Sequence, residues 1–140
     1  LWMKRGFAWH LLFQALLAGS AALVLVEGLA GSLGSHEWLS PQVLLAGALL
    51  GHLAMTLLEP RLAPRGREAE YHRVARLVTA GPFARQHWLF GMGVGVGLPL
   101  LLLLVGDGGV TAALAGVGAL CGLWVEEDVL VRAGQALPIS

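Results

Sequence analysis

The chain has little of what a soluble domain or a cysteine-ligated metal protein needs. Its 140 residues include one cysteine, Cys121, which excludes an internal disulfide framework and any four-cysteine zinc or iron–sulfur site within the chain. Charged residues make up only 13% of the sequence, against 56% hydrophobic residues, and the formal net charge is zero. The mean hydropathy of +0.72 is wrong for a soluble protein of this length, so lipid is the expected solvent.

Four apolar stretches take up most of the chain. A hydrocarbon core of about 30 Å needs roughly 20 mostly apolar residues in a helix. The sequence offers such stretches at about 7–31, 39–59, 86–106 and 109–131. A secretory signal would be one short apolar region followed by a polar protein, which is not the pattern here. The expected fold class is an all-α integral membrane protein, in which residues 1–140 form a single bundle of four transmembrane helices.

The basic residues predict how the chain crosses the membrane. All nine fall at three places that four crossings put on one side: Lys4 and Arg5; Arg61, Arg65, Arg67, Arg73, Arg76 and Arg85; and Arg132. The connections on the other side, around 32–38 and 106–109, carry none. Because Lys and Arg near membrane ends stay on the cytoplasmic side, we expect a multi-pass protein with both ends of this chain cytoplasmic.

The connection 61–86 is the only sizeable segment outside the spans, and it is too short to be a catalytic domain. Its apolar residues recur at helical spacing from Tyr71 to Val78, and charged residues take most of the positions between them. This pattern predicts a short amphipathic helix on the membrane surface, ending at Gly81 and Pro82. A solvated charged loop with one helical turn is the alternative.

Glycines predict where the helices meet, because small residues four apart let two backbones approach closely. The pairs are Gly47 with Gly51, Gly91 with Gly95, and Gly93 with Gly97. The alternating glycines of the third helix predict packing on neighbours along two adjacent stripes. Pro99 follows them, and since proline lacks an N–H group it is expected to kink this helix.

Polar residues inside the spans carry the functional information, because a charged side chain near the bilayer centre costs about 2.5 to 3.5 kcal/mol. Each therefore needs a partner or a water-filled cavity. At about 1.5 Å per residue, most of them fall in the cytoplasmic half of the membrane: His10, Gln14, Glu59, His87 and Glu126 to Asp128. His52 lies deeper, on the same side of the second helix as Glu59, and Glu27 lies near the opposite face.

The three consecutive acids of the fourth helix cannot all face one cavity, since neighbouring helical residues are about 100° apart. Asp128 precedes Arg132 by four residues, the favourable order for an ion pair along a helix. Glu126 points with Gly122 toward the bundle interior, and Glu127 falls between these two directions. The alternative is that the helix ends early and the acids lie among lipid headgroups.

Several chemistries can use these residues. A quinone pocket needs hydrogen-bonding groups and a residue that passes protons, which His52, Gln14 and Glu59 can supply. A proton path needs titratable groups reaching from the cytoplasmic face, and Glu126, His52 and Glu59 are its first candidates. A b-type haem needs two facing histidines at similar depth. His52 with His10 or with His87 is conceivable, but neither clearly matches His52 in depth. A small transporter or a passive scaffold remains open.

Two stretches resemble the NrfD/PsrC family of polysulfide-reductase-type membrane subunits: GLWVEEDVLVRAGQALPIS and EYHRVARLVTAGPFARQHWLFGMGVGVGLPLLL. In the second, a charged helix leads to Gly81 and Phe83, then to Trp88 and a glycine-rich helix that closes on Pro99. The likeness covers the last three spans well and the first loosely. Family members have about eight to ten helices and this chain has four, so we expect it to be the C-terminal half of a longer subunit.

The resemblance implies a membrane anchor of a respiratory oxidoreductase in a bacterial or archaeal plasma membrane. Such a subunit is non-catalytic or quinone-reactive, and it exchanges electrons and protons with menaquinone or ubiquinone. The implied partners are an iron–sulfur electron-transfer subunit, a molybdopterin catalytic subunit and membrane lipid, with no nucleic acid; no haem and no metal is expected in this chain. The family's quinone site is built largely from amino-terminal helices, so the resemblance implies that this chain contributes bundle packing, the cytoplasmic end of a proton route and subunit contacts. Glu126, His52, Glu59 and Gln14 are the candidates for handling protons or lying near the quinone.

Overall fold

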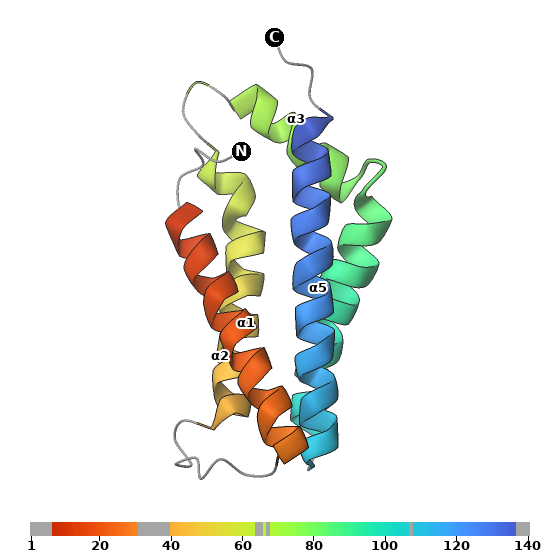
Figure 1. Ribbon diagram of the computed structural model, residues 1–140. Helices are drawn as coiled ribbons and strands as arrows, with labels where there is room; N and C mark the ends of the chain where they lie inside the picture. The colour runs from red at the N-terminus through yellow and green to blue at the C-terminus, as the bar shows by residue number, and fades with distance from the viewer. Residues whose placement is uncertain (1–6, 31–39, 64–65, 67, 107, 137–140) are drawn as a thin grey trace.

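The computed structural model describes residues 7–30, 40–63, 66, 68–106 and 108–136, and nearly all of them are helical. Four helical spans are long and apolar enough to cross a membrane (Figure 1). They are α1 (Phe7–Ala30), α2 (Pro41–Leu58), η3 (Gln86–Gly97) continued by α4 (Leu98–Val105), and α5 (Gly109–Gln135). The expected all-α membrane bundle is confirmed.

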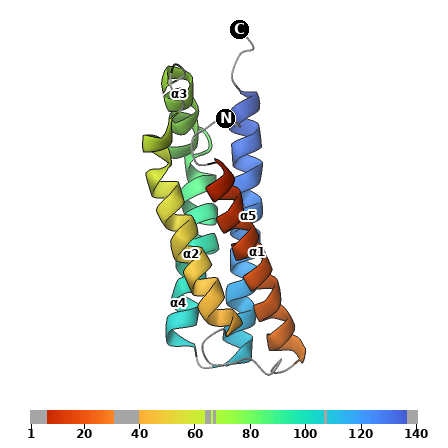
Figure 2. The ribbon, with the colours of Figure 1, turned by 90° about the vertical axis from the view of Figure 1, so that its left-hand side faces the viewer.

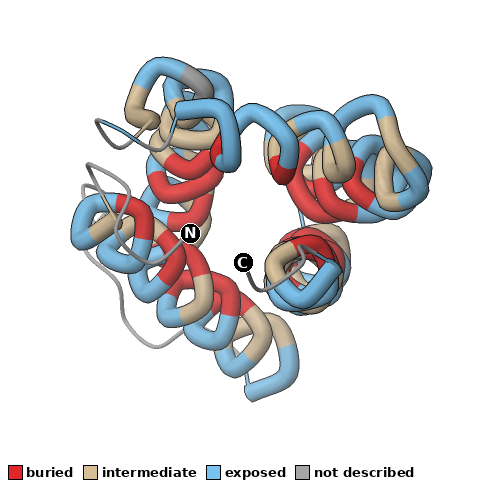
Figure 3. Tube along the Cα trace, turned by 90° about the horizontal axis from the view of Figure 1, so that it is seen from above, coloured by how far each residue is buried: buried red, intermediate tan, exposed pale blue. Residues whose placement is uncertain are grey.

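The four spans lie side by side, and α1 begins at the same end of the bundle at which α5 ends (Figures 1 and 2). A short 3-10 helix, η2 (Glu59–Leu62), follows α2 at this end. Helix α3 (Glu68–Thr79) lies across it, against α5 and η3. We call this the α3 end of the bundle. Seen from above, the buried positions of the spans face one another across the centre (Figure 3).

The predicted spans are correct to within a few residues. Helix α2 begins at Pro41 because Ser40 caps it: the Ser40 hydroxyl accepts a hydrogen bond of 3.3 Å from the Val43 N–H, and proline suits the first turn. Helix α5 continues to Gln135, about one turn past the predicted end. The three acids therefore lie inside a regular helix, and the alternative of an early helix end is wrong.

Small residues set the closest approach between spans. Gly95 of η3 lies against Gly122 of α5, where a Cβ atom added to Gly95 would fall 2.5 Å from the Gly122 Cα. Gly51 of α2 faces the ring of Phe13 on α1, which leaves no room for a side chain there. Alanines, leucines and valines from all four spans fill the centre: Leu17, Ala21, Val24, Leu45, Ala48, Leu49, Val96, Ala112, Ala115 and Ala119.

The prediction of two adjacent packing stripes on the third span was wrong. Gly91 and Gly95 are buried, but Gly93 and Gly97 are exposed. Residues two apart on a helix point to nearly opposite sides, so when one stripe faces α5 the other faces away. Gly47 is also exposed, with nothing within 4 Å of the place where a Cβ atom would lie.

The third span changes helical type along its length. Its first 12 residues, Gln86–Gly97, form a π-helix, and the chain becomes α-helical at Leu98. Proline has no N–H group and its ring clashes with the carbonyl four residues earlier, and Pro99 lies just after the change. The irregularity thus extends through the glycine-rich segment before Pro99 and is not a single kink at the proline.

The amphipathic helix predicted between the second and third spans is present as α3. Its residues Tyr71 and Val74 are buried, and the Tyr71 hydroxyl donates a hydrogen bond of 2.8 Å to the carbonyl of Glu59. Burial raises the pKa of the Tyr71 phenol well above its usual range, and the neighbouring Glu59 raises it further. The indole of Trp88 donates to the Thr79 carbonyl at 2.9 Å. These two bonds fix both ends of α3 to the bundle.

Candidate functional site

Glu126 lies where three spans meet. It projects from α5, and its Oε2 is 2.5 Å from Nε2 of His52 on α2. Its Cγ lies against Gly91 of η3, so closely that a Cβ atom at Gly91 would come within 2.9 Å of it. The glycine therefore makes the room that the carboxylate needs to reach His52.

His52 is the most deeply buried polar side chain of this group, with 1% of its surface exposed, and Glu126 is 12% exposed. No group in the described part of the chain forms a hydrogen bond with Nδ1 of His52. A proton on Nδ1 would be a buried donor with no partner, which costs about 1–3 kcal/mol. The favoured neutral tautomer therefore carries its proton on Nε2, where the imidazole donates it to the Glu126 carboxylate.

A second polar contact lies beside the first and joins α1 to α5. The amide Nε2 of Gln14 donates a hydrogen bond to Oε1 of Glu127. His10, one turn earlier on α1, lies next to His52, with 5.8 Å between the ring centroids and 50° between the ring planes. Both His10 and Gln14 are buried. The site thus takes polar side chains from α1, α2 and α5 at one level of the bundle.

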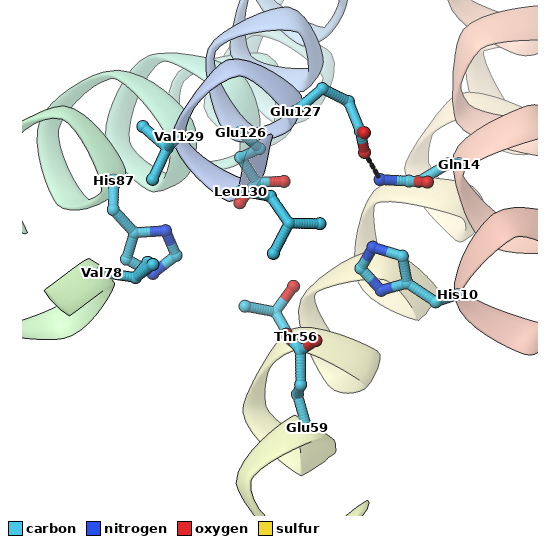
Figure 4. A pocket seen from close by; sticks show the side chains of 10 residues that line it. All are labelled: His10, Gln14, Thr56, Glu59, Val78, His87, Glu126, Glu127, Val129 and Leu130. Atoms are coloured by element: carbon cyan, nitrogen blue, oxygen red, sulfur yellow. Dashed lines mark hydrogen bonds between the residues drawn. The ribbon is translucent and has the colours of Figure 1, made fainter. Parts of the chain in front are cut away.

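These groups surround a cavity of about 50 Å³ that lies toward the α3 end (Figure 4). Its lining residues are His10, Gln14, Thr56, Glu59, Val78, His87, Glu126, Glu127, Val129 and Leu130. The lining has three carboxylates and no lysine or arginine. Histidines are therefore the only side chains of this lining that can carry a positive charge, and they do so by taking up protons.

The structure brings the four predicted proton-handling residues together. Gln14, Glu59 and Glu126 line the cavity, and His52 contacts Glu126 directly behind it. Asp128 lies outside the cavity, where its Oδ1 accepts a hydrogen bond of 2.9 Å from Nε of Arg132. The ion pair expected from their spacing is thus present on the surface of the helix.

His10 lines the cavity from α1 and was not among the predicted site residues. Two further polar residues of the site were not singled out from the sequence. Glu127 was placed between two directions, and it points into the cavity toward Gln14. His87 was noted only for its depth, and it lines the cavity from η3. The depth estimate put both near Gln14 and Glu126, so the signal was present, but facing directions depend on how the helices are rotated against one another. Glu27 is separate: it accepts a hydrogen bond of 3.1 Å from Gln42 near the opposite end of α1.

Within the described residues, no three histidine, cysteine or carboxylate side chains converge as a metal site requires. No protein-family model matches the chain, and neither a curated protein nor a solved structure matches it significantly. What can be inferred about function therefore depends on the geometry of the site and on the sequence stretches quoted above.

Proposed function

We propose that the chain is a membrane anchor subunit of a respiratory molybdopterin/iron–sulfur oxidoreductase of NrfD/PsrC type, and that it carries protons for quinone chemistry. The observation that supports proton handling is the buried contact between His52 and Glu126. The proposal of a quinone and of partner subunits rests on the sequence resemblance alone. In this proposal the α3 end faces the cytoplasm, as the arginines on that side predict.

A buried acid–imidazole pair suits proton transfer for two reasons. Ionisable side chains inside a membrane are costly and mark proton or substrate pathways. Histidine and glutamate also exchange protons near neutral pH, and each can hold the proton that the other releases. In the bundle, Nε2 of His52 and Oε2 of Glu126 are 2.5 Å apart, so a proton can pass directly between them.

The cavity supplies a route from the α3 end to this pair. Glu59 and His87 line it toward that end, and Glu126 lines its inner wall. A cavity of about 50 Å³ exceeds the roughly 10–15 Å³ that one water molecule requires. Water in the cavity would connect Glu59 to Glu126, and protons would pass between the cytoplasm and the pair along it.

The partner subunits are tested by purifying the protein from its native membrane. We expect iron–sulfur and molybdopterin subunits to co-purify, a lipid extract to contain quinone, and the absorption spectrum to lack a Soret band of this chain. A Soret band that follows the chain would favour a haem-binding anchor. A preparation with neither partner subunits nor quinone would favour a transporter or scaffold.

Proton handling is tested with Glu126→Gln, which keeps the shape of the side chain and removes its acid–base function. We expect quinone-linked turnover of the assembled complex to fall at least tenfold, since positioned acid–base groups contribute about 10²–10⁴-fold. Asp128→Asn is the matched control, because Asp128 is on the same helix but outside the cavity. Unchanged turnover in Glu126→Gln, with normal assembly, would refute this role.

A further inference from the structure

A second, larger cavity opens next to the first, between α2, α3 and η3. Its volume of about 380 Å³ falls within the range of about 300–1,000 Å³ typical of small-molecule sites. The lining is mainly apolar, and it includes Leu57, Tyr71, Ala75, His87, Trp88 and Met92. Leu57 and Trp88 are exposed on the outer surface of the bundle, so a molecule dissolved in the membrane can enter there.

The two cavities share a wall. Thr56, Glu59, Val78, His87 and Leu130 line both of them. His87 is the polar ring of that wall: only 7% of it is exposed, and Figure 4 shows it directed from η3 into the polar cavity. Its ring packs edge-on against Trp88, at 4.9 Å between centroids.

Among the side chains that line the larger cavity, His87 differs from Thr56, Tyr71 and Trp88 in its hydrogen bonding. The hydroxyl of Thr56 donates to the carbonyl of His52, and the hydroxyl of Tyr71 and the indole N–H of Trp88 donate to other backbone carbonyls. No hydrogen bond joins the His87 imidazole to another described residue, and although only 7% of the residue is exposed, its ring nitrogens are not closed off as Nδ1 of His52 is. Because His87 lines both cavities, its ring nitrogens can form a hydrogen bond with a ligand atom there.

The charge of the lining distinguishes a phospholipid from an uncharged lipid-soluble molecule as the ligand. It includes the acid Glu59 and no lysine or arginine, so it does not favour the phosphate of a phospholipid. The aromatic residues Tyr71 and Trp88 offer apolar ring surfaces, because their polar atoms are already hydrogen-bonded. The ligand that fits is a flat, uncharged, lipid-soluble ring that carries a hydrogen-bonding oxygen.

We propose that the larger cavity binds the ring of a lipid-soluble quinone and that His87 forms a hydrogen bond with one of the ring oxygens. His87 then connects the quinone to the polar cavity, in which Glu126 lies. The choice of a quinone rests on the proposed function, whereas the position of the site rests on the cavity and on His87. The site would lie within this chain, among α2, α3 and η3.

The experiment uses a short-tailed azido-quinone, photolysed with the assembled complex in its membrane, and mass spectrometry of the labelled residues. We expect labels on residues of the larger cavity, such as Tyr71 and Met92, and we expect unlabelled quinone to compete them away. Ala75→Phe fills this cavity without lining the smaller one and should remove the labels. Ala69→Phe is the matched control, because Ala69 is exposed on the same helix.

The hydrogen bond is tested at His87. We expect His87→Leu to raise the quinone concentration that gives half-maximal protection from labelling by roughly tenfold, the effect of one lost hydrogen bond, and His87→Gln to raise it less. Labelling that unlabelled quinone does not compete away, or that survives Ala75→Phe, would overturn the site. So would labelling of the same residues by a photoreactive phospholipid that quinone fails to displace.

Failure of this inference is distinguishable from failure of the proposed function. If the azido-quinone labels no residue of the cavity while Glu126→Gln still slows turnover, the quinone site is elsewhere and the proton role stands. If the cavity is labelled as expected while Glu126→Gln has full turnover, the quinone site stands and the proton role of Glu126 is wrong.

Discussion

The imidazole of His52 and the carboxylate of Glu126 join the second and fourth spans by a contact of 2.5 Å. The third span contributes Gly91, whose lack of a side chain leaves the space in which the Glu126 side chain lies. The first span closes the site with His10, whose ring lies beside that of His52. One acid–base pair thus depends on the packing of all four spans, and changes in packing should alter its chemistry.

Removing His52 should destabilise the bundle. His52→Phe keeps a ring in place but leaves the Glu126 carboxylate buried without its partner, which costs up to about 3–5 kcal/mol. Thermal unfolding of the purified protein in detergent measures the loss. The double variant His52→Phe with Glu126→Leu should recover much of it, because no charge is then left unpaired. Equal unfolding temperatures for the single variant and the original protein would show that the pair contributes nothing to stability.

Gly91→Ala should impair function more than it impairs folding. The new Cβ atom would fall 2.9 Å from Cγ of Glu126, and that flexible side chain can move away from His52 to relieve the contact. We expect a drop in quinone-linked turnover with assembly retained. Gly97→Ala is the matched control on the same helix, because its Cβ atom meets only the Met92 carbonyl at 3.5 Å. Equal turnover in the two variants would contradict the role given to Gly91.

Much of the fold was predictable because membrane spans leave a simple signal. Four apolar stretches of sufficient length and an amphipathic segment between them define the helices, since a backbone in lipid must form its own hydrogen bonds. Depth along a helix follows from counting residues, which is why Gln14, Glu59 and Glu126 were placed at a similar level. The count put His52 deeper, and its contact with Glu126 was not foreseen. Rotation about each helix axis does not follow from counting, and so the contact of Gln14 with Glu127 was not foreseen.

The remaining features depend on contacts that one sequence does not contain. The π-helical segment changes which residues of the third span face inward, and the sequence showed only a proline after several glycines. The larger cavity exists because α3 lies across the end of the bundle, and its lining combines residues from five helical segments. No local pattern in the sequence predicts how α3 packs against the other helices.

Arg132→Ala should have only a small effect on stability. The pair between Arg132 Nε and Asp128 Oδ1 measures 2.9 Å, but the two side chains are 57% and 33% exposed. Exposed pairs at this helical spacing contribute about 0.3–0.5 kcal/mol and are screened by salt. Chemical unfolding at low and high ionic strength should show a small difference that disappears in high salt. A loss of several kcal/mol would mean that Arg132 has another partner in the assembled protein.

Tyr71 should stay protonated at a pH at which an ordinary tyrosine ionises. Burial, with Glu59 nearby, raises the pKa of its phenol above the usual value of about 10. Because the folded state holds this proton more tightly, the resulting stability is complete below the unfolded pKa and is lost as the pH rises through the folded one. Tyr71 is the only tyrosine of the chain, so ultraviolet absorbance of the purified chain reports its ionisation directly.

We expect almost no phenolate absorbance at pH 10.5 in the folded chain and most of the full signal after denaturation at the same pH, because an ordinary tyrosine is largely ionised there. Tyr71→Phe removes the hydrogen bond of 2.8 Å to the Glu59 carbonyl, which should cost about 1 kcal/mol at neutral pH. It should also remove the tyrosine's share of the stability loss at alkaline pH, so the two proteins should converge in stability as the pH rises. Half-ionisation of Tyr71 near pH 10 in the folded chain would show that α3 does not bury this residue against the bundle.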